Sequence, residues 1–402
     1  MQRIALTPRP NWQRTVESQG LVFHTPDVPE MDRPYWDESA AYKFTAAEID
    51  TLEAAGYKLQ EMCLAAAQHI IDKKRYAELD IPDAAIEAIE WAWNNEPPAI
   101  YGRFDVSWGG ASSGHPPKLL EYNADTPTSL LEAAVIQWNW LKDMPSSLVS
   151  FKPDQFNSIH EKLIAKWKDV DPYLSKPVYF AALDNPDNPE DLLTVTYLRD
   201  TAQQAGLDTR QLAMHDIGWN DSQQAFLDLD EHHMFSIFKL YPWEIMLQEE
   251  FGPHALATYQ STRWIEPIWK MLLSNKGILP ILWELYPHHE LLLESYFDRP
   301  HSMSNYVRKP LTSREGANIT LVNENARNNA TVLTTPGPYN GKQIYQALAP
   351  EVVFTDNLKP NAERHPVLGL WMIDQDSCGL GIRESAGPIT DNLSSFVPHF
   401  FL

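Results

Sequence analysis

The amino-acid sequence predicts a mixed α/β fold. Apolar and polar residues alternate over Ile100–Trp108, which is the period of a half-buried strand. Apolar residues recur at helical spacing over Thr45–Lys74, and Thr45 and Glu48 have the spacing of a capping box. Over residues 178–206 a buried strand, an acidic loop and a helix follow one another, which is the order of an α/β unit.

Length and charge limit the classes of function. A chain of 402 residues exceeds a usual single domain and should form two or three lobes around a large core. Its 32 Lys and Arg against 54 Asp and Glu give a formal net charge of −22, which repels nucleic acid and anionic membranes and attracts cations such as polyamines. We therefore expect no nucleic-acid partner.

Neither a disulfide framework nor a membrane segment is expected. The two cysteines are Cys63 and Cys378, and Cys63 falls inside a predicted helix, where it reads as a core residue. The N-terminus lacks the apolar core of a signal peptide, and no run approaches the roughly 18 apolar residues of a membrane span. A cytoplasmic protein with no membrane partner is expected.

The predicted elements can be followed from the N-terminus. Residues 1–42 are rich in Pro, Trp and Tyr without a sustained period, so we expect an irregular arm that Trp36 and Tyr42 anchor to the body. The amphipathic helix at 45–74 follows the arm. A second helix is predicted at 82–93, and prolines end it ahead of the strand that starts at Ile100.

That strand and a second one at 119–123 predict a hairpin, because the connector between them is rich in turn residues. Arg103 and Asp105 share one face of the first strand, and Glu121 and Asn123 share one face of the second. Antiparallel pairing would gather these four side chains on one surface. Carboxylate and amide oxygens suit a Mg²⁺ ion that holds phosphates, and arginine offers a planar fork for the same phosphates. The alternative is an ordinary polar sheet face.

Helix starts are predicted beside this hairpin and beyond it. Residues 129–140 form a helix whose N-terminus faces the hairpin, where free amide groups favour an anion. The stretch 234–247 is a buried strand that meets a helix at Pro242, with Lys239 near the end of the strand. Residues 288–300 add a further helical piece and a linker.

An acidic loop follows the predicted strand 178–183. Asp187 and Asn188 are turn formers in this loop. Glu190 and Asp191 come where the next helix starts, so they either cap that helix or bind an ammonium group at a ligand pocket. The sequence leaves both interpretations open.

The clearest phosphate signal lies at residues 306–322. A strand ending in Lys309 is followed by a loop of small residues and a second strand from Ile319, so the tip of this hairpin can close over phosphates. Lys276 opens an apolar helix and either points at a phosphate or is a surface lysine. The strand Gln343–Leu348 offers an edge that can hydrogen-bond an adenine.

Arg383 follows two glycines, Gly379 and Gly381, near the C-terminus. We expect these glycines to be flexible. Arg383 would then swing onto a transferring phosphoryl group, or it would pair with Glu384.

These motifs together resemble the glutathionylspermidine synthetase family of ATP-grasp ligases. The likeness runs from Trp12 to Pro398, which is nearly the whole chain. Its motifs are Arg103-Phe-Asp105, Glu121-Tyr-Asn123-Ala-Asp-Thr, Asn275-Lys276, Arg308-Lys309-Pro310, Arg314-Glu-Gly-Ala-Asn318 and Gly381-Ile-Arg383-Glu. The likeness also includes Phe23-His-Thr, Pro34-Tyr-Trp36 and Leu240-Tyr-Pro-Trp-Glu244.

The resemblance implies a role for each matching position. Positions that match ligands of Mg²⁺, with two ions expected, are Asp105, Glu121 and Asn123. Positions that match ATP contacts are Arg103, Asp105, Lys276, Lys309, Arg314, Glu315, Gly316, Gln346, Ala347 and Leu348. The catalytic pair would be Arg103 and a mobile Arg383, which matches an arginine that stabilises the acyl-phosphate step. Positions that fall where the family contacts glutathione and polyamine are Thr126, Glu190, Asp191 and Leu240.

The resemblance also implies an α/β (α+β) ATP-grasp-like fold with a pre-ATP-grasp-like substrate lobe. The metal residues precede the lysines, the reverse of ordinary ATP-grasp enzymes, which implies a circular permutation. Residues 1–145 would carry the metal-binding hairpin, 146–270 the substrate lobe, and 271–402 the ATP-binding part with the phosphate-covering loop.

The implied reaction joins a carboxylate to an amine at the expense of ATP, through an acyl phosphate. The carboxylate would belong to a glutathione-like peptide or an amino acid, and the amine would be a cationic, polyamine-like acceptor. Bifunctional members begin with a Cys/His amidase domain, whereas the resemblance here starts almost at Met1, so no amide hydrolysis is expected. The substrate positions match less well than the ATP positions, as in the stand-alone branch of the family.

Two other classes of function remain open. A catalytically silent nucleotide- or polyamine-binding protein of the same fold would keep the motifs without turnover. A carbohydrate-active hydrolase is suggested by the 14 tryptophans and the many acids, with Glu121 and Asp105 as its paired carboxylates. The hydrolase leaves Lys309 and its loop unexplained.

Overall fold

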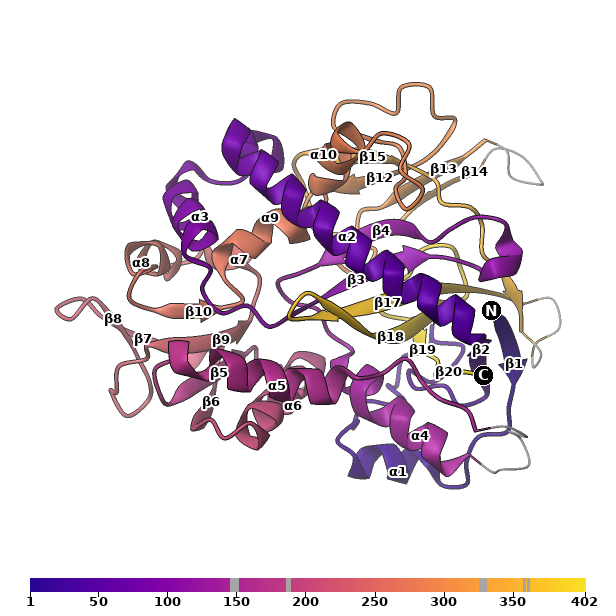
Figure 1. Cartoon of the computed structure of the whole chain (residues 1–402), viewed down its shortest axis with the longest axis horizontal. Coiled ribbons are helices and arrows are strands. Elements are labelled where there is room, and N and C mark those ends of the chain that lie inside the picture. The colour runs from indigo at the N-terminus through magenta and orange to yellow at the C-terminus, as the bar shows by residue number, and fades with distance from the viewer. Residues whose placement is uncertain (145–151, 186–188, 325–330, 357–358, 360–361) are drawn as a thin grey trace.

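The computed structural model of the protein describes residues 1–402 except 145–151, 186–188, 325–330, 357–358 and 360–361. The described part is a mixed α/β structure in which helices cover several sheets, as predicted (Figure 1). The domain boundary predicted at residue 145 and the turn residues Asp187 and Asn188 lie outside the described residues.

The central sheet is antiparallel and joins the two ends of the sequence. Its order is β19 (Ser395–Phe396), β18 (Asp376–Ser385), β17 (Glu363–Ile373), β3 (Tyr101–Ser107) and β4 (Lys118–Asn123), and β16 (Phe354–Thr355) pairs with β17 beside this path. The β3–β4 pairing confirms the predicted hairpin. Because β17 pairs with β3, the C-terminal strands lie directly beside that hairpin.

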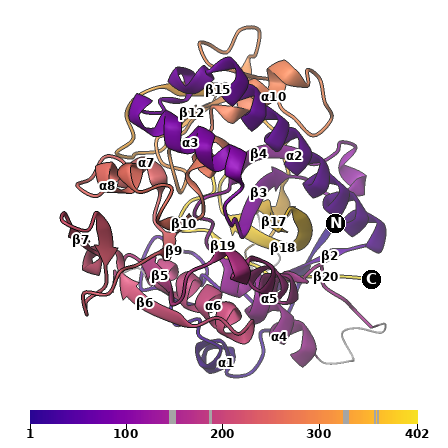
Figure 2. The same cartoon turned by 60° about the vertical axis from the view of Figure 1, so that its left-hand side comes forward.

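A parallel sheet forms a second lobe. Its order is β10 (Arg263–Ile265), β9 (Ser236–Leu240), β5 (Val178–Ala182) and β6 (Thr209–Ala213). Every residue of β5 is buried, as expected for a parallel strand covered on both faces. The helices α5 (Ile159–Val170) and α6 (Glu190–Gln204) lie beside it (Figure 2), which confirms the predicted strand, loop and helix unit.

A third sheet carries the predicted phosphate-binding hairpin. Its order is β11 (Ser295–Tyr296), β15 (Gln343–Ala347), β12 (Asn305–Pro310), β13 (Thr320–Asn323) and β14 (Thr331–Thr334). The antiparallel pair β12–β13 confirms the hairpin. The predicted apolar helix after Lys276 is α10 (Ile278–Leu285), which packs against this sheet.

The N-terminal arm is more regular than predicted. It contains β1 (Gln2–Ala5), α1 (Trp12–Ser18) and β2 (Ala40–Phe44), and the two strands form a small sheet with β20 (His399–Phe401). Trp36 and Tyr42 are fully buried, as expected of anchors. Trp36 stacks on Phe396 with 5.7 Å between ring centroids, which ties the arm to the C-terminal strands.

The remaining helices pack around these sheets. The long α2 (Ala46–Lys73) starts with the predicted capping box of Thr45 and Glu48 and crosses the central sheet (Figure 1). The other α-helices are α3 (Asp83–Asn95), α4 (Gln137–Asp143), α7 (Trp243–Met246), α8 (Gly252–Ala257) and α9 (Met271–Ser274), and β7 (Gly218–Asn220) pairs with β8 (Ala225–Leu227). A π-helical segment, Glu132–Ile136, precedes α4 within the helix predicted at 129–140.

Two local predictions are wrong. Residues 288–300 contain no helix but turns and the short β11; Pro287 and the left-handed His288 (φ 61°) end the helical conformation. Gly379 and Gly381 are not a flexible stretch but lie inside the paired strand β18. A β-carbon at Gly379 would come within 2.5 Å of Ile159, so this glycine serves close packing.

No helix within the described residues is both long enough and apolar enough to cross a membrane.

Candidate active site

Two cavities meet at the β3–β4 hairpin. One has a volume of about 300 Å³ and lies toward the parallel sheet; we call it the substrate-side cavity. The other has a volume of about 480 Å³ and lies over β12 and β15; we call it the nucleotide-side cavity. Residues that line both cavities are Asp105, Glu121, Glu315, Gly316, Val367 and Thr390. The two acids of the hairpin therefore stand at the junction.

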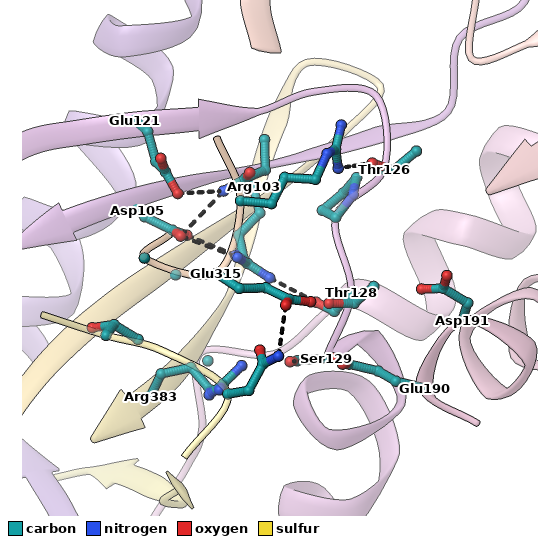
Figure 3. A pocket seen from close by; sticks show the side chains of 18 of the residues that line it. Arg103, Asp105, Glu121, Thr126, Thr128, Ser129, Glu190, Asp191, Glu315 and Arg383 are labelled. Atoms are coloured by element: carbon teal, nitrogen blue, oxygen red, sulfur yellow. Dashed lines mark hydrogen bonds and ion pairs between the residues drawn. The ribbon is translucent and has the colours of Figure 1, made fainter. Parts of the chain in front are cut away.

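The hairpin gathers the four predicted side chains. Asp105 pairs in register with Glu121, and Arg103 pairs with Asn123. Arg103 donates two hydrogen bonds to Asp105, from Nε to Oδ1 at 2.6 Å and from Nη2 to Oδ2 at 3.0 Å. Asn123 donates from Nδ2 to Asp105 at 3.1 Å and to Glu121 at 3.4 Å. The carboxylates of Asp105 and Glu121 lie on one surface, with the Arg103 side chain beside Asp105 (Figure 3).

The surroundings of the two acids differ. Burial raises the pKa of Asp105, and the neighbouring Arg103 only partly opposes that effect. Burial also acts on Glu121, but Lys276 and Lys309 outweigh it and lower its pKa to about 2. Glu121 is therefore charged at neutral pH. With Asp105 and Asn123 it offers hard oxygen donors, which is a set that fits Mg²⁺.

Two lysines line the nucleotide-side cavity. Lys276 lies 2.9 Å from Glu121, and its Nζ also donates to the Ser313 carbonyl at 2.6 Å. Lys309 donates to Gln346 Oε1 at 2.8 Å and to the Leu120 carbonyl at 3.1 Å, and burial lowers its pKa to about 8. The surface-lysine alternative for Lys276 is wrong, because the side chain is buried and paired.

The predicted adenine-side strand also borders this cavity. Gln346, Ala347 and Leu348 line it, together with apolar residues of β12 and β13. Gln346 bridges Lys309 and the Leu119 carbonyl, to which its Nε2 donates at 3.0 Å. The side chain of Gln346 therefore holds Lys309 in place.

The loop between β12 and β13 reaches across to the substrate side. Arg314 donates from Nη1 to Thr126 Oγ1 at 2.6 Å and from Nη2 to Glu244 Oε1 at 2.7 Å. Glu315 and Gly316 line both cavities, and Glu315 accepts a hydrogen bond of 2.6 Å from Asn392. The predicted phosphate-covering loop thus lies over the junction.

The substrate-side cavity has both cationic and acidic walls. Arg103, Arg314 and Arg383 contribute guanidinium groups. The acidic wall is the first turn of α6, which supplies Glu190 and Asp191 (Figure 3). Burial and the nearby Glu190 raise the pKa of Asp191 to about 6. The predicted substrate positions Thr126 and Leu240 line the same cavity.

Arg383 extends from β18 into this cavity. Its Nη2 donates to the Asp391 carbonyl at 2.9 Å, and its guanidinium lies 5.5 Å from the ring centroid of Tyr35. The predicted alternative, an ion pair with Glu384, is wrong because successive strand residues point to opposite faces. Glu384 instead pairs with Arg3 at 2.8 Å.

Comparison with known proteins gives the family. The family model described as "Glutathionylspermidine synthase preATP-grasp" matches residues 3–402. The chain belongs to the glutathionylspermidine synthase family. A full-length relative from Haemophilus influenzae, named "Putative acid–amine ligase", is 37% identical, and the alignment covers 100% of both chains.

Other members of the family are longer than this chain. Trypanothione synthetase of Crithidia fasciculata is 26% identical over 83% of this chain and 52% of its own length. The bifunctional glutathionylspermidine synthetase/amidase of Escherichia coli is 26% identical over 76% of this chain and 51% of its own length. The chain thus spans about half the length of these two relatives.

The fold is also similar to a solved structure. A glutathione synthetase-like effector from Globodera pallida superposes with a TM-score of 0.57 at 12% identity, covering 90% of this chain and 89% of the other. At this identity the similarity concerns the fold alone.

Sequence reasoning missed several side chains of the site. Glu244 anchors Arg314, and Tyr35 lies beside Arg383. Glu132 is buried near the substrate-side cavity and accepts a hydrogen bond from Tyr35. Tyr35 and Glu244 fall within stretches that match the family, but no role in the site was predicted for them. Glu132 also left a signal in the sequence, because it is a single charge within the apolar stretch Leu130–Ile136.

Proposed function

We propose that the protein is an ATP-dependent carboxylate–amine ligase that forms an amide bond through an acyl phosphate. One observation carries this proposal: a lysine-lined cavity and a cavity with arginine and carboxylate walls meet at Asp105 and Glu121. Such a junction lets a nucleotide on one side reach a carboxylate on the other. The family supports the same class of reaction.

The nucleotide-side cavity would bind ATP. Lys276 and Lys309 would contact its phosphates, and the strand edge at Gln346–Leu348 would face the adenine. The loop with Arg314, Glu315 and Gly316 would cover the phosphates. Asp105, Glu121 and Asn123 would hold Mg²⁺, with two ions expected, and the bound metal supplies positive charge that offsets the charge of the phosphates.

The substrate-side cavity would hold the two joining groups. Arg103 and Arg383 would orient the donor carboxylate and stabilise charge on the transferring phosphoryl group. Glu190 and Asp191 would attract the ammonium group of the acceptor. Thr126 and Leu240 would contact the donor. We propose a small peptide or amino acid as the donor and a cationic, polyamine-like amine as the acceptor.

The reaction needs activation because a carboxylate is a poor electrophile at neutral pH. Phosphorylation makes the carboxyl carbon reactive, and water must be excluded until the amine attacks. Arg314 suits this second need, since its contacts to Thr126 and Glu244 join the covering loop to the substrate side. We further propose that the fold is a circularly permuted ATP-grasp.

The test is ADP release measured with a matrix of small peptides and amines, with the amide product identified by mass spectrometry. We expect ADP release that depends on Mg²⁺, on a carboxylate and on an amine together. ATP binding without any turnover would favour the catalytically silent alternative. Glycoside hydrolysis without nucleotide would overturn the ligase.

A further inference from the structure

A buried acid, Glu132, lies behind residues that line the substrate-side cavity. Glu132 begins the π-helical segment Glu132–Ile136 and is 2% exposed. Helical irregularities of this type occur frequently at functional sites. The carboxylate of Glu132 accepts a hydrogen bond of 2.7 Å from the hydroxyl of Tyr35. Neither residue lines the cavity itself.

Hydroxyl groups connect Glu132 to the cavity. The Tyr35 hydroxyl lies 3.1 Å from Ser129 Oγ, and Ser129 Oγ lies 3.4 Å from Glu190 Oε1. Ser129 and Glu190 both line the cavity (Figure 3). Ser129 is buried and adopts a left-handed conformation (φ 64°), which non-glycine residues rarely adopt outside constrained sites. The result is a continuous path from Glu190 through Ser129 and Tyr35 to Glu132.

The charge environment suits proton exchange at Glu132. Its titratable and charged neighbours are Tyr35 from the arm, Glu190 from α6 and Arg383 from β18. Burial and the nearby Glu190 raise the pKa of Glu132 to about 7, although the Tyr35 hydrogen bond and Arg383 oppose that effect. A carboxylate of this kind can accept a proton and release it again near neutral pH.

The proposed ligase has a step that needs such a group. A cationic amine carries no free electron pair, so its ammonium group must lose a proton before the nitrogen can attack the acyl phosphate. The arginines of the cavity cannot accept that proton, because a guanidinium stays charged.

We propose that Glu132 is the final proton acceptor of a relay that begins at Glu190 and runs through Ser129 and Tyr35. This inference rests on the proposed function. An N–H bond of the acceptor ammonium breaks, and its proton passes to the Glu190 carboxylate while the electron pair stays on nitrogen. Glu190 passes a proton to Ser129, Ser129 passes its own to Tyr35, and Tyr35 passes its own to Glu132. The nitrogen then attacks the carboxyl carbon, the bond from that carbon to the phosphate oxygen breaks, and the second proton that the nitrogen must lose leaves with the phosphate as hydrogen phosphate. Glu132 returns its own proton to solvent after product release.

Glu190 would touch the substrate, whereas Glu132 and Tyr35 act only through other groups. Their role can therefore be separated from catalysis by changing the acceptor. Hydroxylamine is largely uncharged at neutral pH and attacks acyl phosphates without prior deprotonation, giving a hydroxamate. It should bypass the relay.

The test compares a diamine with hydroxylamine as acceptor for the same carboxylate and ATP. We expect Glu132→Gln and Tyr35→Phe to lower kcat with the diamine by roughly tenfold to a hundredfold, within the usual range for positioned proton transfer. Hydroxamate formation should fall by less than about twofold on the same basis, since no proton must leave first. With the diamine, the wild-type rate should rise with pH through about 7, and the rise should disappear in Glu132→Gln.

The matched control is Tyr76→Phe. Tyr76 is also buried and donates to a glutamate, Glu90, at 2.9 Å, but it lines neither cavity. We expect this variant to change neither reaction. Thermal unfolding of each variant reports whether the fold is retained.

The possible results distinguish failure of the proposed proton relay from failure of the proposed ligase function. Equal losses with both acceptors would mean that Glu132 and Tyr35 only support the structure, which overturns the relay. Unchanged diamine turnover in both variants would overturn it as well. Failure of the wild-type protein to form hydroxamate with any donor carboxylate would overturn the proposed function itself.

Discussion

Asp105 and Glu121 face each other on neighbouring strands, yet their surroundings shift their pKa values in opposite directions. Burial dominates at Asp105, whereas the two lysines dominate at Glu121. The proposed binding of phosphates and Mg²⁺ would use both kinds of neighbour. The lysines would neutralise part of the negative charge of the phosphates, and the carboxylates would bind the metal.

Replacing Glu121 should separate metal binding from folding. Glu121→Gln keeps the size of the side chain and can still accept a hydrogen bond from Lys276, but it removes the charge. We expect ATP turnover to fall by roughly a hundredfold or more, the scale on which lost electrostatic stabilisation acts. ADP release measured across Mg²⁺ concentrations checks this. Glu61→Gln on the exposed side of α2 is the control, and wild-type turnover in Glu121→Gln would contradict the metal assignment.

Arg383 lines the substrate-side cavity but not the nucleotide-side cavity. Arg383→Ala should therefore lower kcat by roughly a hundredfold or more, as when a transition-state contact is removed, and leave the Kd for ATP nearly unchanged. Arg383→Lys should recover part of the rate, because it restores the charge without the planar fork. Rapid-quench turnover and equilibrium nucleotide binding provide the two readouts. A matching loss of ATP affinity would identify Arg383 as a ground-state contact.

The pKa of Asp191 should give the proposed acceptor site a pH dependence. With a pKa of about 6, Asp191 loses its negative charge as the pH falls through that value. The KM for a cationic acceptor should therefore rise between pH 7 and pH 5, while the KM for ATP is less affected. Initial rates at fixed ATP measure this. Asp191→Asn should remove the rise, and an unchanged pH profile in that variant would exclude Asp191 from the acceptor site.

At the scale of elements, the strand β18 decides where Arg383 lies. Its glycines allow close packing: at Gly379 a β-carbon would meet Ile159 of α5, and at Gly381 it would lie 3.1 Å from Phe396. The strand is held on both sides, by β17 and by β19. Movement of Arg383 would therefore involve its side chain rather than the strand.

Substitution at Gly379 distinguishes packing from flexibility. Gly379→Ala should lower the free energy of unfolding by about 1–3 kcal/mol, because the added methyl group overpacks the contact with Ile159. A glycine that served only flexibility would give the opposite sign, since alanine reduces the entropy of the unfolded chain. Urea unfolding measures the difference. Adding Ile159→Ala should make the Gly379→Ala change less costly, and additive effects would argue against this contact.

At the scale of the whole molecule, the central sheet brings distant segments together. The hairpin β3–β4 comes from the first third of the chain, and β17–β18 come from its end. The formal net charge of −22 surrounds this site with a field that attracts cations. Salt screens long-range attraction of this kind. It screens the attraction between a bound cation and carboxylates at short range less.

Salt should weaken the binding of a cationic acceptor. We expect its KM to rise as ionic strength increases from low values toward 0.15 M, where the Debye length is about 8 Å. A neutral amino acid as acceptor should show little change. The double variant Glu190→Gln and Asp191→Asn should raise the KM at every salt concentration without affecting ATP binding. If neutral amino acids prove the better acceptors, the polyamine-like class is wrong and the ATP half of the proposal remains.

Much of the fold could be predicted because its signals are local. The period of β3, the capping box of α2 and the sequence of strand, loop and helix around β5 depend on residues near one another in the chain. The prediction of helix within 288–300 was wrong because Pro287 and His288 end the helical conformation, and apolar spacing does not report that His288 adopts a left-handed backbone conformation. The prediction that the glycines of β18 are flexible was wrong, because a glycine that serves flexibility and a glycine that serves close packing leave the same residue in the sequence.

The sequence by itself determined the residue types of the site and its motifs, because hairpin register and strand period place Arg103, Asp105, Glu121 and Asn123 together. Only the tertiary structure decided which distant groups join them. The pairing of β3 with β17 brings β18 and Arg383 to the hairpin, Glu244 of α7 meets Arg314 of the loop between β12 and β13, and Tyr35 from the arm meets Glu132. The physical reason is that such contacts depend on how whole elements pack. No local spacing encodes the distance between residues that lie 70 or more positions apart in the chain.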